Sequence, residues 1–286
     1  MDKKLLYEGK NIFYRIIGSG KPVVLTHGFG EDGEIWKAPS NSPNGGEVYS
    51  QSSLFENSLL ISKFKFIIPD LPGSGKSEMI NDMSIEGMAE VIKSIVEVVF
   101  RSSPVGGGQV GAIGHSMGGY ITLAFAEKYP EYLNAFGLFH SSAYADSEEK
   151  KQTRKKGIEF IKQHGAFEFL KTVVPNLFSP ESKEKIPEKI NDFIKSLHNF
   201  SPDALVSYYE AMMQRPDRTD VLKKSKIPVL FIMGKYDTAI PLEDGLKQCH
   251  LPEKSYIHIL HKSGHMGMIE EAEESTRFLE EFLMQT

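Results

Sequence analysis

The amino-acid sequence predicts an α/β protein with a mostly parallel sheet that is flanked by helices. Short apolar runs alternate with segments of helical periodicity along most of the 286 residues, which is typical of parallel strands joined by helices. A strand pattern at 110–113 continues directly into a glycine-rich turn and a helix pattern at 120–129. Residues 144–226 lack clear strand patterns and carry several helical ones, so we expect a helical insertion there.

The expected elements follow one another in a simple order. A hairpin is predicted at 5–7 and 11–17. Six further strands are predicted by apolar runs, at 23–26, 64–68, 110–113, 135–139, 227–233 and 255–260. Helices are predicted by apolar residues at helical spacing, with Ser84 as a candidate N-cap, at 84–100, 120–129, 148–164, 166–174, 184–196, 202–214, 243–249 and 270–284.

Composition limits the classes of function. The chain has 33 lysines and arginines against 38 aspartates and glutamates, a formal net charge of −5, which disfavours nucleic acid as the main partner. A single cysteine, Cys249, allows no intramolecular disulfide and is compatible with a reducing compartment. The first residues lack the apolar core of a signal peptide, and no segment has the apolar length of a membrane span. We therefore expect a cytoplasmic protein without stable membrane insertion.

The turn Gly-His-Ser-Met-Gly at 114–118 predicts a nucleophilic serine. A tight turn from strand to helix forces Ser116 into a strained backbone conformation and leaves its hydroxyl exposed. Gly114 and Gly118 remove the Cβ atoms that would clash in such a turn. The following helix directs its N-terminal amide groups to the place where an oxyanion would form.

Asp237 and His265 complete a candidate catalytic triad with Ser116. Each of the three directly follows a predicted strand, and ligands bind beyond the carboxyl ends of parallel strands. A serine hydroxyl needs an adjacent base, so His265 would take its proton. Asp237 would orient the imidazole and stabilise its charged form. The other candidates for the acid follow an apolar strand less directly, and they are Asp146, Glu243 and Asp244.

Further residues at the same edge are expected to contact the substrate. Gly28 lies in a glycine-rich loop after the strand at 23–26, Trp36 follows shortly afterwards, and His140 comes directly after the strand at 135–139. The glycine-rich loop can turn a backbone N–H inward as half of an oxyanion hole. Residues 39–53 are rich in Ser, Asn, Gly and Pro, and this composition predicts a loop that could form part of the pocket entrance.

Two glycine patterns resemble nucleotide-binding motifs without their context. The Gly-x-Gly-x-x-Gly pattern at 28–33 follows a strand, but no long helix follows it, so the dinucleotide-binding unit is incomplete. Gly-Lys-Ser at 75–77 lacks the glycine that a phosphate-binding loop needs five residues earlier, where Asp70 stands, and Pro72 interrupts the loop. A structural turn is the better interpretation of the second pattern, and no cofactor is expected.

The other histidines have structural interpretations. His27 is expected to hold the glycine-rich loop by a hydrogen bond, and His115 points away from the serine that follows it. His261 and His265 are four residues apart in a turn rather than on a helix, and no matching carboxylate motif accompanies them. We therefore expect no metal site.

These motifs together resemble the α/β-hydrolase fold family, in particular its capped esterases, lipases and epoxide-hydrolase-like members. The matching stretches extend over nearly the whole chain, at 27–30, 70–75, 114–119, 234–237 and 263–265. The resemblance implies an α/β-hydrolase core of eight strands at 1–143 and 227–286, and a helical cap at 144–226. It also implies that the backbone N–H groups of Phe29 and Met117 form the oxyanion hole. Epoxide hydrolases and haloalkane dehalogenases of this group have Asp where Ser116 stands, which argues against both activities.

The expected activity is hydrolysis of a carboxylic ester of a small or medium acyl compound, through an acyl-enzyme on Ser116. The same triad could instead hydrolyse a carbon–carbon bond, a thioester or a lactone, or act as a cofactor-free perhydrolase. A non-catalytic receptor with the same fold is a further alternative, and the complete triad argues against it. We expect a monomer or a homo-dimer.

Overall fold

The computed structural model describes residues 2–36, 58–101 and 108–286, so the loop expected at 39–53 lies outside the described residues. In the described part, the strands form one sheet in the order β1-β2-β4-β3-β5-β6-β7-β8. β1 and β2 pair antiparallel, as do β2 and β4, and all other pairs from β4 to β8 are parallel. The predicted fold class is therefore confirmed. The strands are β1 (Asp2–Tyr7), β2 (Lys10–Gly18), β3 (Lys21–Thr26), β4 (Phe64–Pro69), β5 (Val110–His115), β6 (Leu133–Phe139), β7 (Val229–Gly234) and β8 (Ser255–Leu260).

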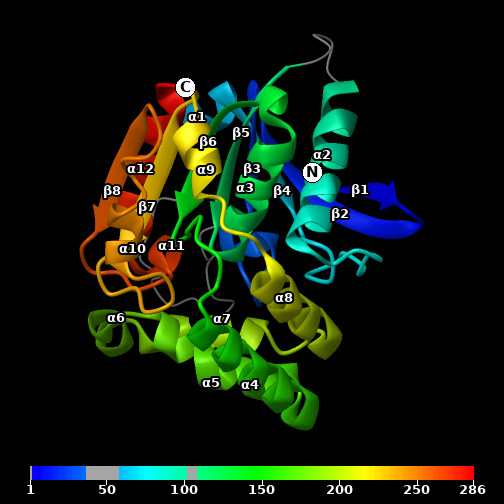
Figure 1. The fold of residues 1–286 in the computed structure, drawn as a ribbon, viewed down its shortest axis with the longest axis vertical. Coiled ribbons are helices and arrows are strands. Elements are labelled where there is room, and N and C mark those ends of the chain that lie inside the picture. The colour runs from blue at the N-terminus through cyan, green and yellow to red at the C-terminus, as the bar shows by residue number, and fades with distance from the viewer. Residues whose placement is uncertain (1, 37–57, 102–107) are drawn as a thin grey trace.

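Helices cover both faces of the sheet (Figure 1). α2 (Ile85–Arg101) and α3 (Met117–Lys128) pack on one face, and α1 (Ser58–Lys63) and α12 (Ala272–Met284) pack on the other. Shorter elements connect these layers, namely η1 (Gly33–Trp36), η2 (Pro130–Tyr132), α10 (Leu242–Leu246) and α11 (Gly267–Glu270). Among the described residues, no helix combines the length and the apolar character needed to cross a bilayer.

The alternation of side chains along the strands explains the two-sided core. Successive residues of a strand point to opposite faces of the sheet. Val23 and Leu25 of β3 accordingly belong to the apolar cluster under α1 and α12, whereas Val24 belongs to the cluster under α2 and α3. A strand that is buried on both faces must be apolar at consecutive positions, and this is the pattern from which β3 was predicted.

Five helices that follow β6 gather at one end of the sheet (Figure 1). They are α4 (Glu148–His164), α5 (Ala166–Val173), α6 (Pro180–Lys185), α7 (Pro187–Ser196) and α8 (Pro202–Gln214), with η3 (Val174–Leu177) after α5. The N–H of His265, beyond the end of β8, donates to the carbonyl of Leu177 at 2.7 Å, so this end is the carboxyl end of the strands. α9 (Thr219–Lys224) packs against α3 instead. The boundaries expected for the cap, 144 and 226, stay predictions.

Two predicted helices are divided in the structure. The segment predicted as one helix at 184–196 is split between α6, which ends at Lys185, and α7, which begins at Pro187. A proline lacks the N–H that continues a helix, but it fits well at the first helical position. The helix predicted at 270–284 is likewise preceded by the separate short helix α11.

The Asp70 turn is held together internally. The carboxylate of Asp70 is fully buried and accepts hydrogen bonds from the guanidinium of Arg15 at 2.6 Å and from the N–H of Gly33 at 3.1 Å. Its second oxygen accepts the N–H of Lys76 at 3.0 Å. An amide of the apparent phosphate-binding pattern is therefore already used by a carboxylate of the chain, which agrees with a structural turn.

Candidate active site

Ser116 lies in a strained turn between β5 and α3. Its φ of 51° and ψ of −116° lie in a region that non-glycine residues rarely occupy. The turn is fixed from the side of β6, because the N–H of Ser116 donates to the carbonyl of Phe139 at 2.9 Å. The hydroxyl of Ser141 also donates to the carbonyl of Ser116 at 2.7 Å. A Cβ atom on Gly114 would lie 2.2 Å from the backbone of Gly118, so the crowding predicted for this turn is present.

Two main-chain N–H groups beside Ser116 are free to stabilise an oxyanion. Met117 is the first residue of α3, and Phe29 follows β3. Within the described part of the chain, no group accepts a hydrogen bond from the N–H of either residue. Gly28 differs, because its N–H donates to the Glu31 carboxylate at 2.7 Å. A Cβ atom on Gly28 would lie 3.1 Å from the Ser116 Cβ, so the glycine-rich loop lies directly against the elbow.

Asp237 and His265 form a buried hydrogen-bonded pair. Their side chains are 1% and 4% exposed, and His265 Nδ1 lies 2.7 Å from Asp237 Oδ2. The other carboxylate oxygen accepts the N–H groups of Ala239 at 2.9 Å and Ile240 at 2.8 Å. Burial by itself raises the pKa of the Asp237 carboxyl, but the charge and hydrogen bonds of His265 and His140 hold that pKa well below its usual value. The side chain of Asp237 is therefore ionised, and its hydrogen bonds hold it in one orientation.

His265 is placed beside the elbow through its own backbone. His115 Nε2 donates to the carbonyl of His265 at 3.0 Å, and the two rings are 5.1 Å apart at their centroids. Among the described contacts, no hydrogen bond joins Ser116 Oγ to His265. Such contacts are often longer before substrate is bound. The structure thus joins Asp237 to His265 by a hydrogen bond and places the backbone of His265 beside the elbow that carries Ser116. The catalytic roles of the three residues stay predictions.

A buried ion pair connects the pieces of this site. Glu31 Oε2 lies 3.0 Å from His115 Nδ1, and both side chains are almost completely buried. Burial disfavours both charges, but their mutual attraction lowers the pKa of Glu31 and raises the pKa of His115. Because Glu31 also accepts the N–H of Gly28 and His115 also donates to the carbonyl of His265, the pair links the glycine-rich loop after β3 to His265.

Glu31 was not among the site residues predicted from the sequence. A carboxylate directly after a glycine-rich loop was the available signal, but nothing in the sequence identified its partner.

His115 is structural, as expected. His27 also agrees with its prediction: its Nε2 accepts the N–H of Leu71 at 2.9 Å, so its Nδ1 carries the proton and donates to the carbonyl of Gly28 at 2.9 Å.

We expect Glu31→Gln to weaken both folding and catalysis. One carboxylate oxygen accepts two N–H donors at this position. In the variant, the glutamine can place its NH₂ group against a neutral His115. The same NH₂ group then faces the N–H of Gly28, so two donors meet without an acceptor. Leaving one buried group unsatisfied should cost about 1–3 kcal/mol of unfolding free energy, measured by urea denaturation. We also expect kcat/KM to fall about ten-fold or more, since 1.4 kcal/mol corresponds to a factor of ten.

Glu159→Gln, at an exposed position of α4, is the matched control, and equal unfolding curves for the two variants would contradict the role of Glu31.

Two residues expected to contact substrate, Trp36 and His140, have buried side chains. Trp36 is 5% exposed and packs in the core under α1 and α12, with its ring 5.9 Å from that of Phe139. The His140 side chain is completely buried, and its Nδ1 lies 3.1 Å from Asp237 Oδ2. Both side chains are enclosed by protein in the described structure, and their expected contact with substrate stays a prediction. Residue type and position after a strand do not indicate whether a side chain faces the cavity or the interior.

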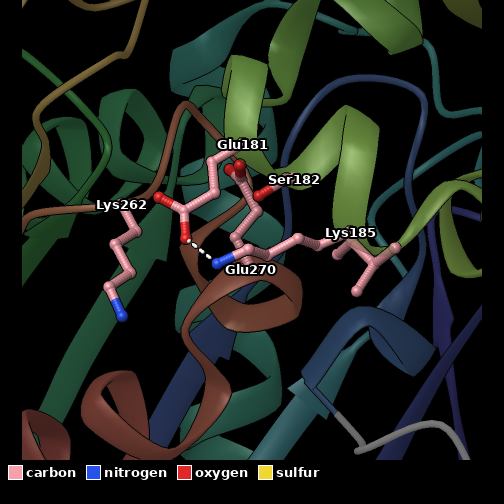
Figure 2. Close-up of a pocket in the computed structure, with 6 residues that line it drawn as sticks. Glu181, Ser182, Lys185, Lys262 and Glu270 are labelled. Atoms are coloured by element: carbon pink, nitrogen blue, oxygen red, sulfur yellow. Dashed lines mark hydrogen bonds and ion pairs between the residues drawn. The ribbon is translucent and has the colours of Figure 1, made fainter.

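Glu270 holds the loop that carries His265. One of its carboxylate oxygens accepts the N–H groups of Gly264 at 2.9 Å and Met266 at 3.0 Å, on either side of His265. The other oxygen accepts the N–H of Ser179 at 2.8 Å, directly before α6. Figure 2 shows Glu270 on α11 in a pocket that is also lined by residues of α6. The helices at the end of the sheet are therefore fastened to the His265 loop.

One buried group of residues has the spacing of metal ligands in the described part of the chain. Nitrogen and oxygen atoms of His140, Asp237 and His265 lie within 4.8 Å of one another. Asp237 Oδ2 is the hydrogen-bond partner of both imidazoles, so each potential ligand is already used by a neighbour. The arrangement fits a hydrogen-bond network, and the expected lack of a metal site stays a prediction.

Comparison with known proteins identifies the family of this chain. The 2-hydroxy-6-oxononadienedioate/2-hydroxy-6-oxononatrienedioate hydrolase of Burkholderia vietnamiensis is 24% identical, over 95% of this chain and 90% of its own. The 2-hydroxy-6-oxo-6-phenylhexa-2,4-dienoate hydrolase of Comamonas testosteroni is also 24% identical, over 96% of this chain and 91% of its own. A solved thermophilic esterase from Thermogutta terrifontis superposes with a TM-score of 0.85 at 26% identity, covering 100% of this chain and 98% of that one. Residues 23–277 match the profile of the alpha/beta hydrolase family, and the chain therefore belongs to that family of enzymes.

Proposed function

We propose that this protein is a serine hydrolase that cleaves carboxylic esters of small or medium acyl groups through an acyl-enzyme on Ser116. One observation carries the proposal. Ser116, in a strained turn, is followed by the uncommitted N–H of Met117 and lies against the loop that carries the uncommitted N–H of Phe29. The histidine next to this elbow, His265, is hydrogen-bonded to the carboxylate of Asp237. A nucleophile, a base with its orienting acid and oxyanion donors are the components that acyl transfer requires.

The proposed reaction uses each of these groups in turn. His265 Nε2 takes the proton of Ser116 Oγ while that oxygen attacks the ester carbonyl. The negative charge that forms on the carbonyl oxygen is stabilised by the N–H groups of Phe29 and Met117. His265 then gives the proton to the leaving alcohol, which leaves the acyl group bound to Ser116. Water attacks this ester in the same way, with His265 again as the base, and releases the acid.

The helices between β6 and β7 are proposed to shape the acyl pocket. The ring of Phe29 stacks on that of Tyr209 in α8, with centroids 4.3 Å apart and planes within 6° of parallel. It also meets the ring of Phe169 in α5 edge-on at 6.4 Å. The loop that supplies an oxyanion donor is thus packed against these helices, which supports their role as a cap that limits the size of the substrate.

A carbon–carbon bond hydrolase is the second candidate. It is favoured by the relatives from Burkholderia vietnamiensis and Comamonas testosteroni, whose names describe hydrolases of 2-hydroxy-6-oxo-dienoates. The esterase from Thermogutta terrifontis, which covers nearly the same length at 26% identity, favours the ester. Both activities would use the same three side chains, so the substrate must be distinguished by experiment.

A fluorophosphonate probe and a short substrate panel test this proposal. We expect the probe to label the protein once, at Ser116, because phosphonylation needs an activated serine. We expect p-nitrophenyl acetate and butyrate to be hydrolysed faster than 2-hydroxy-6-oxo-6-phenylhexa-2,4-dienoate. Cleavage of the dienoate is measured by its loss of absorbance. A protein without labelling would be a binding module, and faster cleavage of the dienoate would favour the second candidate.

A further inference from the structure

His140 contributes a second imidazole to the carboxylate of Asp237. It lies directly after β6, with φ of 47°, in a region of backbone conformation that few non-glycine residues adopt. Its Nδ1 is 3.1 Å from Asp237 Oδ2, and its Nε2 is 3.2 Å from the backbone nitrogen of Gly267. Gly267 thus lies against the imidazole ring of His140, and a Cβ atom on Gly267 would lie 2.5 Å from His140 Nε2.

These contacts fix the protonation state of His140. A backbone N–H can only donate, so Nε2 of His140 accepts the hydrogen bond from Gly267 and carries no proton. The proton is therefore on Nδ1, which donates to Asp237. Burial lowers the pKa of His140 to about 4, although Asp237 opposes this shift. His140 is thus a neutral donor in the pH range where His265 must act as a base.

We propose that His140 is a positioning residue for the Asp237–His265 pair. By donating to the carboxylate oxygen that His265 also uses, it fixes Asp237 and weakens the attraction of Asp237 for a proton on His265. A proton acceptor is useful in catalysis only while it is unprotonated, so His140 extends the activity of His265 to lower pH. This role rests on the proposed function for its effect on catalysis, but its effect on His265 is measurable without turnover.

Asp237 is the charged group around His140 whose interactions a change at His140 would alter. Asp237 accepts four hydrogen bonds, two at Oδ1 from backbone N–H groups and two at Oδ2 from imidazoles. The other titratable groups that face His140 in the described structure are His265, with its ring 5.6 Å away, and His115, with its ring 6.0 Å away. The charge of His115 is balanced by Glu31, and Glu270 is occupied by the backbone around His265.

Two amide substitutions separate the two hydrogen bonds of His140. In His140→Asn, the amide nitrogen takes the place of Nδ1 and keeps the donor to Asp237, while the acceptor for Gly267 is lost. In His140→Gln, the amide oxygen takes the place of Nε2 and keeps the acceptor, while the donor to Asp237 is lost. His140→Leu also lacks the donor and serves as a second test if the Gln variant does not fold, which thermal unfolding monitors.

The pH dependence of His265 distinguishes the proposed role from a structural one. In His140→Gln, we expect the NMR resonances of the His265 ring to titrate about 0.5–1 pH unit higher than in the unsubstituted protein, because a donor to the paired carboxylate has been removed. The acidic limb of kcat/KM should move by the same amount, and both should stay in place in His140→Asn. If the resonances do not move in His140→Gln or His140→Leu, the proposal is overturned, whether or not any ester is hydrolysed. Equal losses of kcat in the Asn and Gln variants without a pH shift would show a packing role instead.

Discussion

Ser116→Ala should abolish ester hydrolysis while the protein remains folded. The hydroxyl is the only group of this side chain that the proposed reaction uses, and no described neighbour accepts or donates a hydrogen bond to it. Removing the nucleophile of a serine triad lowers kcat by about 10⁴- to 10⁶-fold, because the remaining groups then act only on bound water. We expect a loss of this size with p-nitrophenyl butyrate, measured by release of nitrophenolate.

Stability measurements separate this effect from misfolding. Alanine fits the space of Ser116, so the free energy of unfolding should change by less than about 1 kcal/mol. Ser94→Ala on α2 is a matched control, since the Ser94 hydroxyl donates to the carbonyl of Glu90 within its own helix and has no part in the proposed reaction. Wild-type turnover in Ser116→Ala, with the same unfolding curve, would exclude the acyl-enzyme on this residue.

Features governed by local rules could be predicted from the sequence. The elbow at 114–118 was identified because a strand, a helix and two glycines constrain the turn within a few residues. A strained backbone was expected at Ser116, and its φ is 51°. Most of the strands were predicted because they are buried on both faces and are therefore continuously apolar. Ser84 was predicted as an N-cap from residue type, and its hydroxyl does accept the N–H of Gly87 at 3.0 Å.

Contacts made across the sheet could not be predicted in this way. The parallel register pairs His115 of β5 with Phe139 of β6, and Phe139 with Ile232 of β7. This register brings the residues after β6 and β7 together, including His140 and Asp237. The sequence predicted that His140 lies at this edge of the sheet. It did not predict the φ of 47°, at which the ring of His140 is hydrogen-bonded to the carboxylate of Asp237.

The same limit explains why Glu31 was missed. A carboxylate next to a glycine-rich loop is more often exposed to solvent than buried. Its partner His115 is 84 residues away, and the pair forms only because β3 and β5 are neighbours in the sheet. Sequence spacing carries no information about such a pair, whereas the order Ser116, Asp237, His265 is a property of the chain itself.

Asp237→Asn should lower kcat about 10⁴-fold with little change in KM. The backbone N–H groups of Ala239 and Ile240 donate to Oδ1 of Asp237, so they select the carbonyl oxygen of the new amide for that position. The amide NH₂ group then takes the place of Oδ2 and faces the Nδ1 atoms of His265 and His140. His265 can accept this hydrogen bond only if its proton moves to Nε2.

A proton on Nε2 is the reason for the large loss. That nitrogen must be free to take the proton of Ser116, and the wrong tautomer removes the base while the geometry stays nearly the same. We expect the fluorophosphonate probe to label Asp237→Asn correspondingly more slowly. Asp244→Asn on α10 is a matched control, because Asp244 is the alternative acid from the same loop region and its carboxylate lies 3.9 Å from Lys247. If Asp244→Asn lost activity and Asp237→Asn kept it within ten-fold, the assignment of the acid would be reversed.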